Sequence, residues 1–213
     1  MPRFTYQRNE TGNELETYEW DNVWWEHTEN SEAPRVLLVG DSISCGYRDI
    51  LNEQLKGKIL VDGFGTSKAV DNPHFLASLR VFMAQMNRCD LVLFNNGAHG
   101  WHLTDEKYKE SYRRLVESLR AECGNTPMML ALTIPIRESK DLTQFEARNE
   151  RVIARNVAVL SLADEWGLQV LDYYSVLYDK PQLYSQDGLH LTREGYTVLS
   201  GLCASRLTER LLG

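Results

Sequence analysis

Residues 35–44 read RVLLVGDSIS, and this stretch decides which fold the chain can adopt. The run RVLLVG is short, almost wholly apolar and ends in glycine, which is typical of a strand buried on both faces. The polar residues Asp41 and Ser42 follow directly. The pattern therefore predicts a buried strand that leaves the sheet through a polar turn into a helix.

Four further apolar runs repeat this pattern along the chain. They read KILVD, DLVLFNN, PMMLALTIP and LQVLD, and longer stretches with helical spacing separate them. Alternation of strands and helices is typical of parallel sheets covered by helices on both faces. The sequence thus predicts a three-layer α/β/α sandwich with a mainly parallel five-stranded sheet.

Capping residues mark the expected helix ends. A helix is predicted from about Thr104 to Cys123, closed by Gly124, because glycine commonly ends helices. Thr143–Glu146 has the form of a capping box, which predicts the start of a long helix that runs to Trp166. A last helix is expected after Thr192.

Residues 1–34 differ from the rest of the chain. They carry Tyr18, Trp20, Trp24 and Trp25 among many acids and amides, which is too aromatic for a disordered tail. We therefore divide the chain into an aromatic N-terminal arm, residues 1–34, and a catalytic domain, residues 35–213. The rings of the arm are expected to lie on the domain body, or on a second subunit of a homo-oligomer.

Composition limits the classes of partner. The net charge of −7 argues against nucleic-acid and membrane binding, because both need a basic surface. The N-terminus lacks the apolar segment of a secretory signal, and the four cysteines form no CxxC pair. These features favour free thiols in a reducing cytoplasm, with an exported mature form as the alternative.

Polar residues gather where the predicted strands end. Gly40–Ser42, the loop after Asp62 and Asn95–His99 all follow apolar runs. In open α/β sheets, ligands bind beyond the carboxyl ends of the strands. We therefore expect these three segments to form one site at one edge of the sheet.

Ser42 gains significance from a distant stretch, DGLH, which holds Asp187 and His190. An isolated serine at this turn more often only caps the helix. A serine hydroxyl becomes a nucleophile when an imidazole takes its proton, and the imidazole needs an acceptor on its other nitrogen. Asp187 and His190 lie three residues apart in a glycine-containing turn, so one loop can hold base and orienting carboxylate together.

With these two blocks the chain resembles the SGNH, or GDSL-type, hydrolases. The resemblance rests on Gly40–Ile43 after the first strand and on Asp187–His190 before the last helix, and it covers residues 35–213. It implies the flavodoxin-like SGNH hydrolase fold. It also implies that Ser42 is the nucleophile and that Asp187 and His190 complete a catalytic triad.

The oxyanion hole of the resembled family is matched less closely. That hole uses the serine N–H, an N–H in the loop after the second strand and an Asn side chain after the third. Counting from Asp62 puts the second donor at Ser67, with Gly65 as the alternative. In the stretch NNGAHGWH the third position falls on His99, with Asn96 as the alternative.

Other motifs predict no cofactor and no metal. The stretch GFGTSK is neither a Walker loop nor a dinucleotide fingerprint. His99 and His102 have the spacing of a metal pair but lack a cysteine or carboxylate at ligand spacing. Arg48, Arg80 and Arg137 are interpreted as surface or salt-bridging residues, with a place in the substrate cleft as the alternative for Arg137.

The resemblance predicts a serine ester hydrolase that acts through an acyl-enzyme. The expected substrate is a small-molecule or carbohydrate ester with a short acyl group, such as an O-acetyl group. Two alternatives remain open at this stage. One is an acyltransferase with the same triad, and the other is a non-catalytic binding module that has kept the fold.

Overall fold

The stretch RVLLVG forms β2 (Arg35–Gly40), which lies inside a six-stranded sheet in the computed structural model. The structure describes residues 18–213, so the start of the predicted arm lies outside the described residues. The strand order is β1-β3-β2-β4-β5-β8. The other strands are β1 (Asp21–Trp24), β3 (Leu60–Thr66), β4 (Leu91–Phe94), β5 (Met128–Ala131) and β8 (Gln169–Leu171).

The five predicted strands are β2, β3, β4, β5 and β8, and all their pairings are parallel. The sheet nevertheless has six strands, because β1 adds to β3 in antiparallel orientation. β1 has the sequence DNVW and is exposed along its length, so it lacks the apolar alternation by which strands are recognised. The prediction of a mainly parallel sheet is confirmed. The predicted number of strands, five, is wrong because β1 adds a sixth at the edge.

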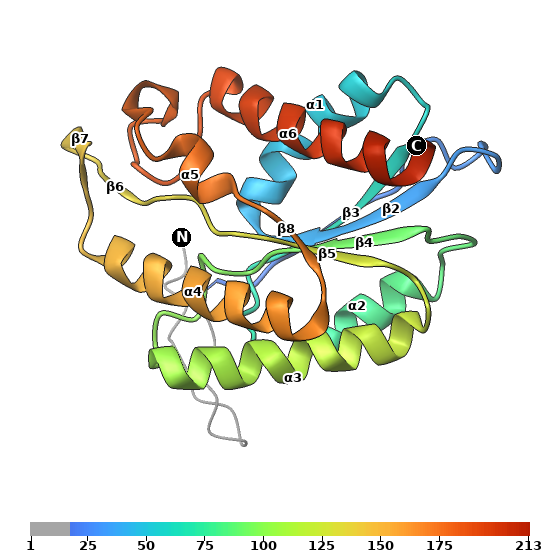
Figure 1. Cartoon of the computed structure of the whole chain (residues 1–213), viewed down its shortest axis with the longest axis horizontal. Coiled ribbons are helices and arrows are strands. Elements are labelled where there is room, and N and C mark those ends of the chain that lie inside the picture. The colour runs from blue at the N-terminus through green and yellow to red at the C-terminus, as the bar shows by residue number, and fades with distance from the viewer. Residues whose placement is uncertain (1–17) are drawn as a thin grey trace.

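Helices cover both faces of the sheet, as Figure 1 shows. One face carries α1 (Ser42–Leu55), α5 (Tyr173–Leu177) and α6 (Arg193–Leu212). The other face carries α2 (Phe75–Met83), α3 (Asp105–Cys123) and α4 (Arg148–Trp166). Residues of β2 alternate between the two cores: Val36 and Leu38 contact the first, and Leu37 and Val39 the second. The predicted three-layer sandwich is therefore confirmed.

Two predicted helix starts agree with the structure. The side chain of Thr104 accepts the N–H of Lys107 at the start of α3, and that of Thr192 accepts the N–H of Gly195 at the start of α6. These bonds satisfy N–H groups that have no partner inside the helix. Both predicted starts are confirmed, and the structure shows that threonine side chains cap them.

The predicted capping box at Thr143–Glu146 is wrong. Thr143 lies in β7 (Asp141–Phe145), which forms a small antiparallel hairpin with β6 (Arg137–Glu138), and α4 begins only at Arg148. The Asp141 carboxylate accepts both the N–H and the hydroxyl of Thr143, at 3.0 and 2.6 Å. This local bond uses the threonine in a turn, which competes with its use as a helix cap. A 3₁₀ turn (Pro181–Leu183) precedes the last helix.

The described part of the arm lies on the domain body. The Trp25 ring stacks on Phe82 of α2 with 4.0 Å between ring centroids, and the Arg48 guanidinium lies 4.9 Å from the Trp24 ring. These contacts follow the first of the two arrangements considered for the rings. The division of the chain at residue 34 stays a prediction.

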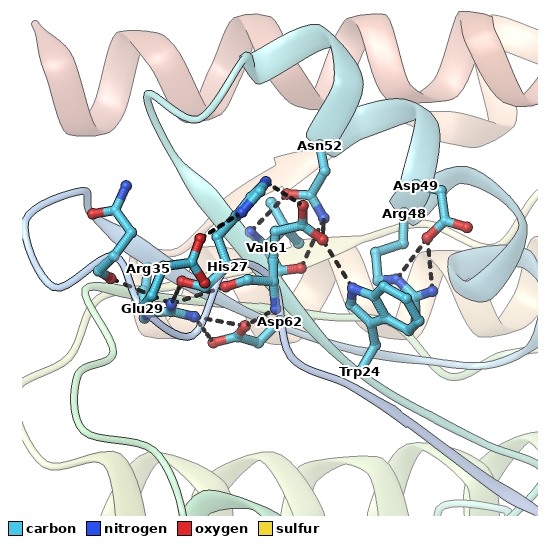
Figure 2. Close-up of polar contacts among 11 residues, drawn as sticks. Trp24, His27, Glu29, Arg35, Arg48, Asp49, Asn52, Val61 and Asp62 are labelled. Atoms are coloured by element: carbon cyan, nitrogen blue, oxygen red, sulfur yellow. Dashed lines mark hydrogen bonds and ion pairs between the residues drawn. The ribbon is translucent and has the colours of Figure 1, made fainter.

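A buried ion pair joins the arm to the amino ends of the strands (Figure 2). The Arg35 guanidinium binds both carboxylate oxygens of Asp62, at 2.7 and 2.8 Å, and their side chains are only 10% and 1% exposed. Asp62 also accepts the N–H of Glu26, and Arg35 donates to the carbonyls of Glu26 and His27. The arm backbone thus completes the hydrogen bonding of a pair that is largely shielded from water.

Within residues 18–213, no helix combines the length and the apolar character needed to cross a membrane.

The buried pair predicts a large loss of stability when it is broken. Asp62→Ala should lower the free energy of unfolding by about 3–5 kcal/mol, because it leaves the Arg35 charge buried without its partner. Urea denaturation measures this change. The control is Arg206→Ala, which removes an exposed pair with Glu209 and should cost at most about 1 kcal/mol. Equal losses in the two variants would contradict the prediction.

Candidate active site

Ser42 is the first residue of α1 and lies directly beyond the carboxyl end of β2. The N-cap is Asp41, whose side chain accepts the N–H of Ile43 at 3.0 Å. The Ser42 hydroxyl is therefore not used as the cap. Glycine is required before this turn, because a Cβ on Gly40 would lie 1.9 Å from the Oγ of Ser44.

Asp187 and His190 lie in the loop that precedes α6. Gly188 has a φ of +74°, and a Cβ there would lie 2.0 Å from the carbonyl oxygen of Arg137, so the turn requires glycine. The N–H of Arg137 donates to the Gly188 carbonyl at 2.8 Å. The loop is thereby held against the β6–β7 hairpin.

The structure brings the three predicted side chains into one hydrogen-bonded chain. His190 Nε2 lies 2.9 Å from Ser42 Oγ, and His190 Nδ1 lies 2.7 Å from Asp187 Oδ2. The other oxygen of Asp187 accepts the N–H groups of Leu189 and His190 and the hydroxyl of Ser185. The carboxylate is thus held rigidly behind the imidazole.

Electrostatics favour the ionised form of Asp187. Its partial burial acts to raise the pKa, but the hydrogen bonds from His190, Leu189 and Ser185 outweigh this effect and hold the pKa well below its usual range. An ionised carboxylate can only accept, so Nδ1 of His190 carries the proton. Nε2 is then the acceptor for the Ser42 hydroxyl, which is the arrangement that a general base needs.

The expectation that Ser67 offers a free N–H is contradicted. Its N–H donates to the Trp20 carbonyl at 3.1 Å, and its hydroxyl accepts the N–H of Trp20 at 2.8 Å. The arm therefore occupies the position at which the resemblance places the second oxyanion donor. The alternative, Gly65, lies inside β3 between Asn22 and Gly40 of the neighbouring strands, and not in the loop beyond it.

Asn96 and His99 both lie in the loop that follows β4. Asn96 is fully buried, and its amide donates to the Lys68 carbonyl at 2.9 Å, which ties this loop to the loop after β3. The Tyr108 hydroxyl holds the Asn96 carbonyl from α3. His99 is half-buried. One of the two amide hydrogens of Asn96 is thus used in structure, and both His99 and Asn96 stay predictions for the third donor.

Two arginines of the site region were not recognised from the sequence. Arg137 is 2% exposed and donates to the carbonyls of Leu142, Leu177 and Tyr178, so its interpretation as a surface or salt-bridging residue is wrong. Arg155 is 1% exposed and donates to carbonyls of the loop after β4. A usable signal for Arg155 is its spacing of three from Val152 and four from Val159, which places it on the apolar face of α4.

A cavity of about 500 Å³ lies at the opposite end of β2 from Ser42. Arg35 and Asp62 line it at the amino end of β2, whereas Ser42 follows the carboxyl end of the same strand. A strand of this length spans roughly 20 Å. The cavity is therefore separate from the hydrogen-bonded chain of Ser42, His190 and Asp187.

The lowered pKa of Asp187 predicts how stability depends on pH. A carboxyl group with a lowered pKa stabilises the fold above its ordinary pKa of about 3.9, and this contribution disappears as pH falls through the lowered value. The difference in free energy of unfolding between wild type and Asp187→Asn should be constant from about pH 5 to 7 and shrink below about pH 4. Urea unfolding at several pH values measures it, and a difference that grows on acidification would contradict the assignment.

The loop after β4 predicts unequal effects of two substitutions. If His99 donates to an oxyanion, His99→Ala should lower kcat by about 10²–10³, and His99→Asn should be much milder because it restores a donor. Initial rates with a chromogenic acetyl ester measure both. An active His99→Ala variant beside an inactive, folded Asn96→Ala variant would assign the donor to Asn96 instead.

Comparisons with known proteins identify the family and the fold. A family model described as the GDSL-like lipase/acylhydrolase family matches residues 38–198. The chain is similar to a carbohydrate acetylesterase family member from Sinorhizobium meliloti, with 19% identity and a TM-score of 0.67, over 84% of this chain and 100% of that chain. A lipolytic protein of the G-D-S-L family from Veillonella parvula gives 15% identity and a TM-score of 0.66, over 83% and 99% of the two chains.

A third similar structure is the acetyl xylan esterase AlAXEase, with 18% identity and a TM-score of 0.64, over 81% of this chain and 99% of that chain. At such identities the similarity establishes the fold. No curated protein matches the chain.

Proposed function

We propose that this chain, which belongs to the GDSL-like lipase/acylhydrolase family, is a serine ester hydrolase with Ser42, His190 and Asp187 as its catalytic triad. One observation carries the proposal: Ser42 Oγ, His190 and Asp187 Oδ2 form an unbroken chain of hydrogen bonds of 2.9 and 2.7 Å. Nucleophile, base and orienting carboxylate are then within the distances that proton transfer needs.

The proposed reaction has two halves. Ser42 Oγ attacks the ester carbonyl while His190 Nε2 takes the hydroxyl proton, and the resulting imidazolium is stabilised by the ionised Asp187. His190 then gives this proton to the departing alcohol oxygen, which leaves an acyl group on Ser42. Water attacks the acyl-enzyme, His190 takes the proton of the water, and its return to Ser42 Oγ releases the carboxylic acid.

The proposed substrate is a short-chain acyl ester, and an O-acetyl group on a carbohydrate is the specific candidate. The side chains of His190 and Asp187 are 41% and 52% exposed, so the triad is open to an ester on a bulky alcohol. An acetyl xylan esterase and a carbohydrate acetylesterase family member are among the structurally similar proteins. An acetyl group needs little apolar surface, which suits an open site.

One observation favours a second candidate, a non-catalytic binding module on the same fold. The Ser67 N–H is bound to Trp20, so an oxyanion hole of the family's usual kind is incomplete. The two candidates differ in a simple measurement. A module binds acetylated carbohydrate without turnover, whereas the proposed esterase releases acetate.

Covalent labelling tests the proposal. A fluorophosphonate should label Ser42 and no other serine, as mapped by peptide mass spectrometry. Ser42→Ala should lower kcat for a chromogenic acetyl ester by about 10⁴–10⁶, because the nucleophile is lost. The matched control is Ser205→Ala on the exposed part of α6, which should leave the rate unchanged. Retention of more than roughly a tenth of the activity in Ser42→Ala would reject the triad, given the size of that loss.

A further inference from the structure

Arg155 of α4 is buried, and within residues 18–213 it forms no ion pair with a carboxylate. The side chain is 1% exposed, and its guanidinium donates to the carbonyls of Gly97, His99 and Gly100 at 2.8, 2.6 and 2.7 Å. Its Cζ lies 4.3 and 4.4 Å from the ring centroids of Trp101 and Tyr108. Three acceptors and two rings therefore surround one guanidinium.

The charge on Arg155 persists in this setting. Burial lowers its pKa to about 10, and nearby Tyr108 acts in the opposite direction. A group with this pKa is still protonated at neutral pH. The carbonyl groups of the loop after β4 are thus bound by a full positive charge inside the protein, where the attraction is stronger than in water.

This arrangement fixes which way the peptide groups of the loop point. The described residues contain no cis peptide bond, and in a trans peptide the C=O of one residue and the N–H of the next point in opposite directions. Because Arg155 binds the carbonyls of Gly97 and Gly100, the N–H groups of Ala98 and Trp101 point away from α4. The loop therefore has a carbonyl side and an N–H side.

The loop after β4 and the turn of the candidate nucleophile lie at the same edge of the sheet, because β4 is the direct neighbour of β2 and their pairing is parallel. α4 covers one face of the sheet and α1, which begins with Ser42, covers the other (Figure 1). Arg155 binds the loop from the side of α4, so the N–H groups of Ala98 and Trp101 are not directed at α4.

We propose that Arg155 is a positioning residue that orients the peptide groups after Gly97 and Gly100 so that the N–H groups of Ala98 and Trp101 face Ser42 and stabilise the oxyanion formed there. This inference rests on the proposed esterase function. It supplies the donor that the usual pattern lacks here, since the arm has taken the Ser67 N–H. Arg155 itself touches neither substrate nor reacting atoms.

The experiment compares Arg155→Met and Arg155→Lys with wild type, using kcat per serine labelled to completion by a fluorophosphonate so that unfolded protein is not counted. Methionine keeps the volume and removes every donor, whereas lysine keeps the charge and loses the planar fork. Misplacement of reacting groups by about 1 Å costs about 10²-fold, so kcat should fall by about that factor with little change in KM. The fall in kcat should be smaller for Arg155→Lys than for Arg155→Met.

Two readouts separate orientation from stability. A boronic acid forms a tetrahedral, anionic adduct on the serine, so its affinity should fall by the same factor as kcat, while the affinity for the product alcohol should not change. Methylguanidinium at a non-denaturing concentration should partly restore kcat to Arg155→Ala, whereas tetramethylammonium should not. A purely structural arginine gives neither result.

The matched control is Arg113→Met. Arg113 lies on α3 beside the Trp166 ring and pairs with exposed Glu165, so it resembles Arg155 in stacking but binds no carbonyl of the loop. Its kcat should equal that of wild type.

The outcomes distinguish this inference from the proposed function. An inactive Ser42→Ala variant together with unchanged kcat and boronic acid affinity in both Arg155 variants overturns the role of Arg155 alone. Turnover that survives Ser42→Ala overturns the proposed function. Parallel losses in kcat and boronic acid affinity, with rescue by methylguanidinium, support the role of Arg155.

Discussion

The parallel pairing of β2 with β3 and β4 is the constraint on which the site depends. Val39 pairs with Phe64 on one side and with Phe94 on the other, so all three strands end at the same edge. Ser42 and His190 are 148 positions apart, and a single hydrogen bond contributes only about 1 kcal/mol. Their contact therefore cannot assemble the site by itself. Packing of the sheet brings the loops together, and the triad is formed as a consequence.

The N-terminal arm adds a sixth strand to the sheet and contacts the loop at the carboxyl end of β3. β1 pairs the outer edge of β3 and takes its place as the short edge strand of the sheet. The arm is held at both ends of β3, by Asp62 at the amino half and by Ser67 just beyond the carboxyl end. The bond at Ser67 uses the backbone N–H of a residue that lies at the same end of the sheet as Ser42. The arm thus binds the N–H group at the position where the resemblance predicts an oxyanion donor.

The parts of the structure that could be predicted from sequence are those with local causes. Apolar runs marked the parallel strands, Thr104 and Thr192 marked helix starts, and the spacing of Asp187 and His190 marked a loop that holds both side chains. Each depends on residues within a few positions of one another, so a short pattern contains the necessary information.

The parts that could not be predicted depend on partners far away in the sequence. β1 forms because β3 offers an unpaired edge, and the composition of DNVW does not reveal this. The Ser67 N–H has its partner 47 residues earlier, at Trp20. Tertiary contacts decide these two cases, and a single sequence does not show them. Thr143 differs from them, because its partner Asp141 is only two residues away; two local patterns, a turn and a capping box, could use the same side chain, and the turn does so.

Arg137 and Arg155 are buried and bind backbone carbonyls, because loops at the strand ends need hydrogen-bond donors in the interior. Loops that leave a sheet carry carbonyl groups into the interior, and each buried carbonyl must find a donor. A guanidinium offers five N–H donors in one plane, so one side chain can satisfy several carbonyls, and aromatic rings can cover its faces. Arg155 does this for the loop after β4, between Trp101 and Tyr108. Arg137 does so beside the loop of Asp187, between Phe145 and Tyr184. A carboxylate partner would draw such a guanidinium away from the carbonyls. Within residues 18–213 neither side chain forms an ion pair with an acidic residue, which suits their use as scaffolds for the two loops.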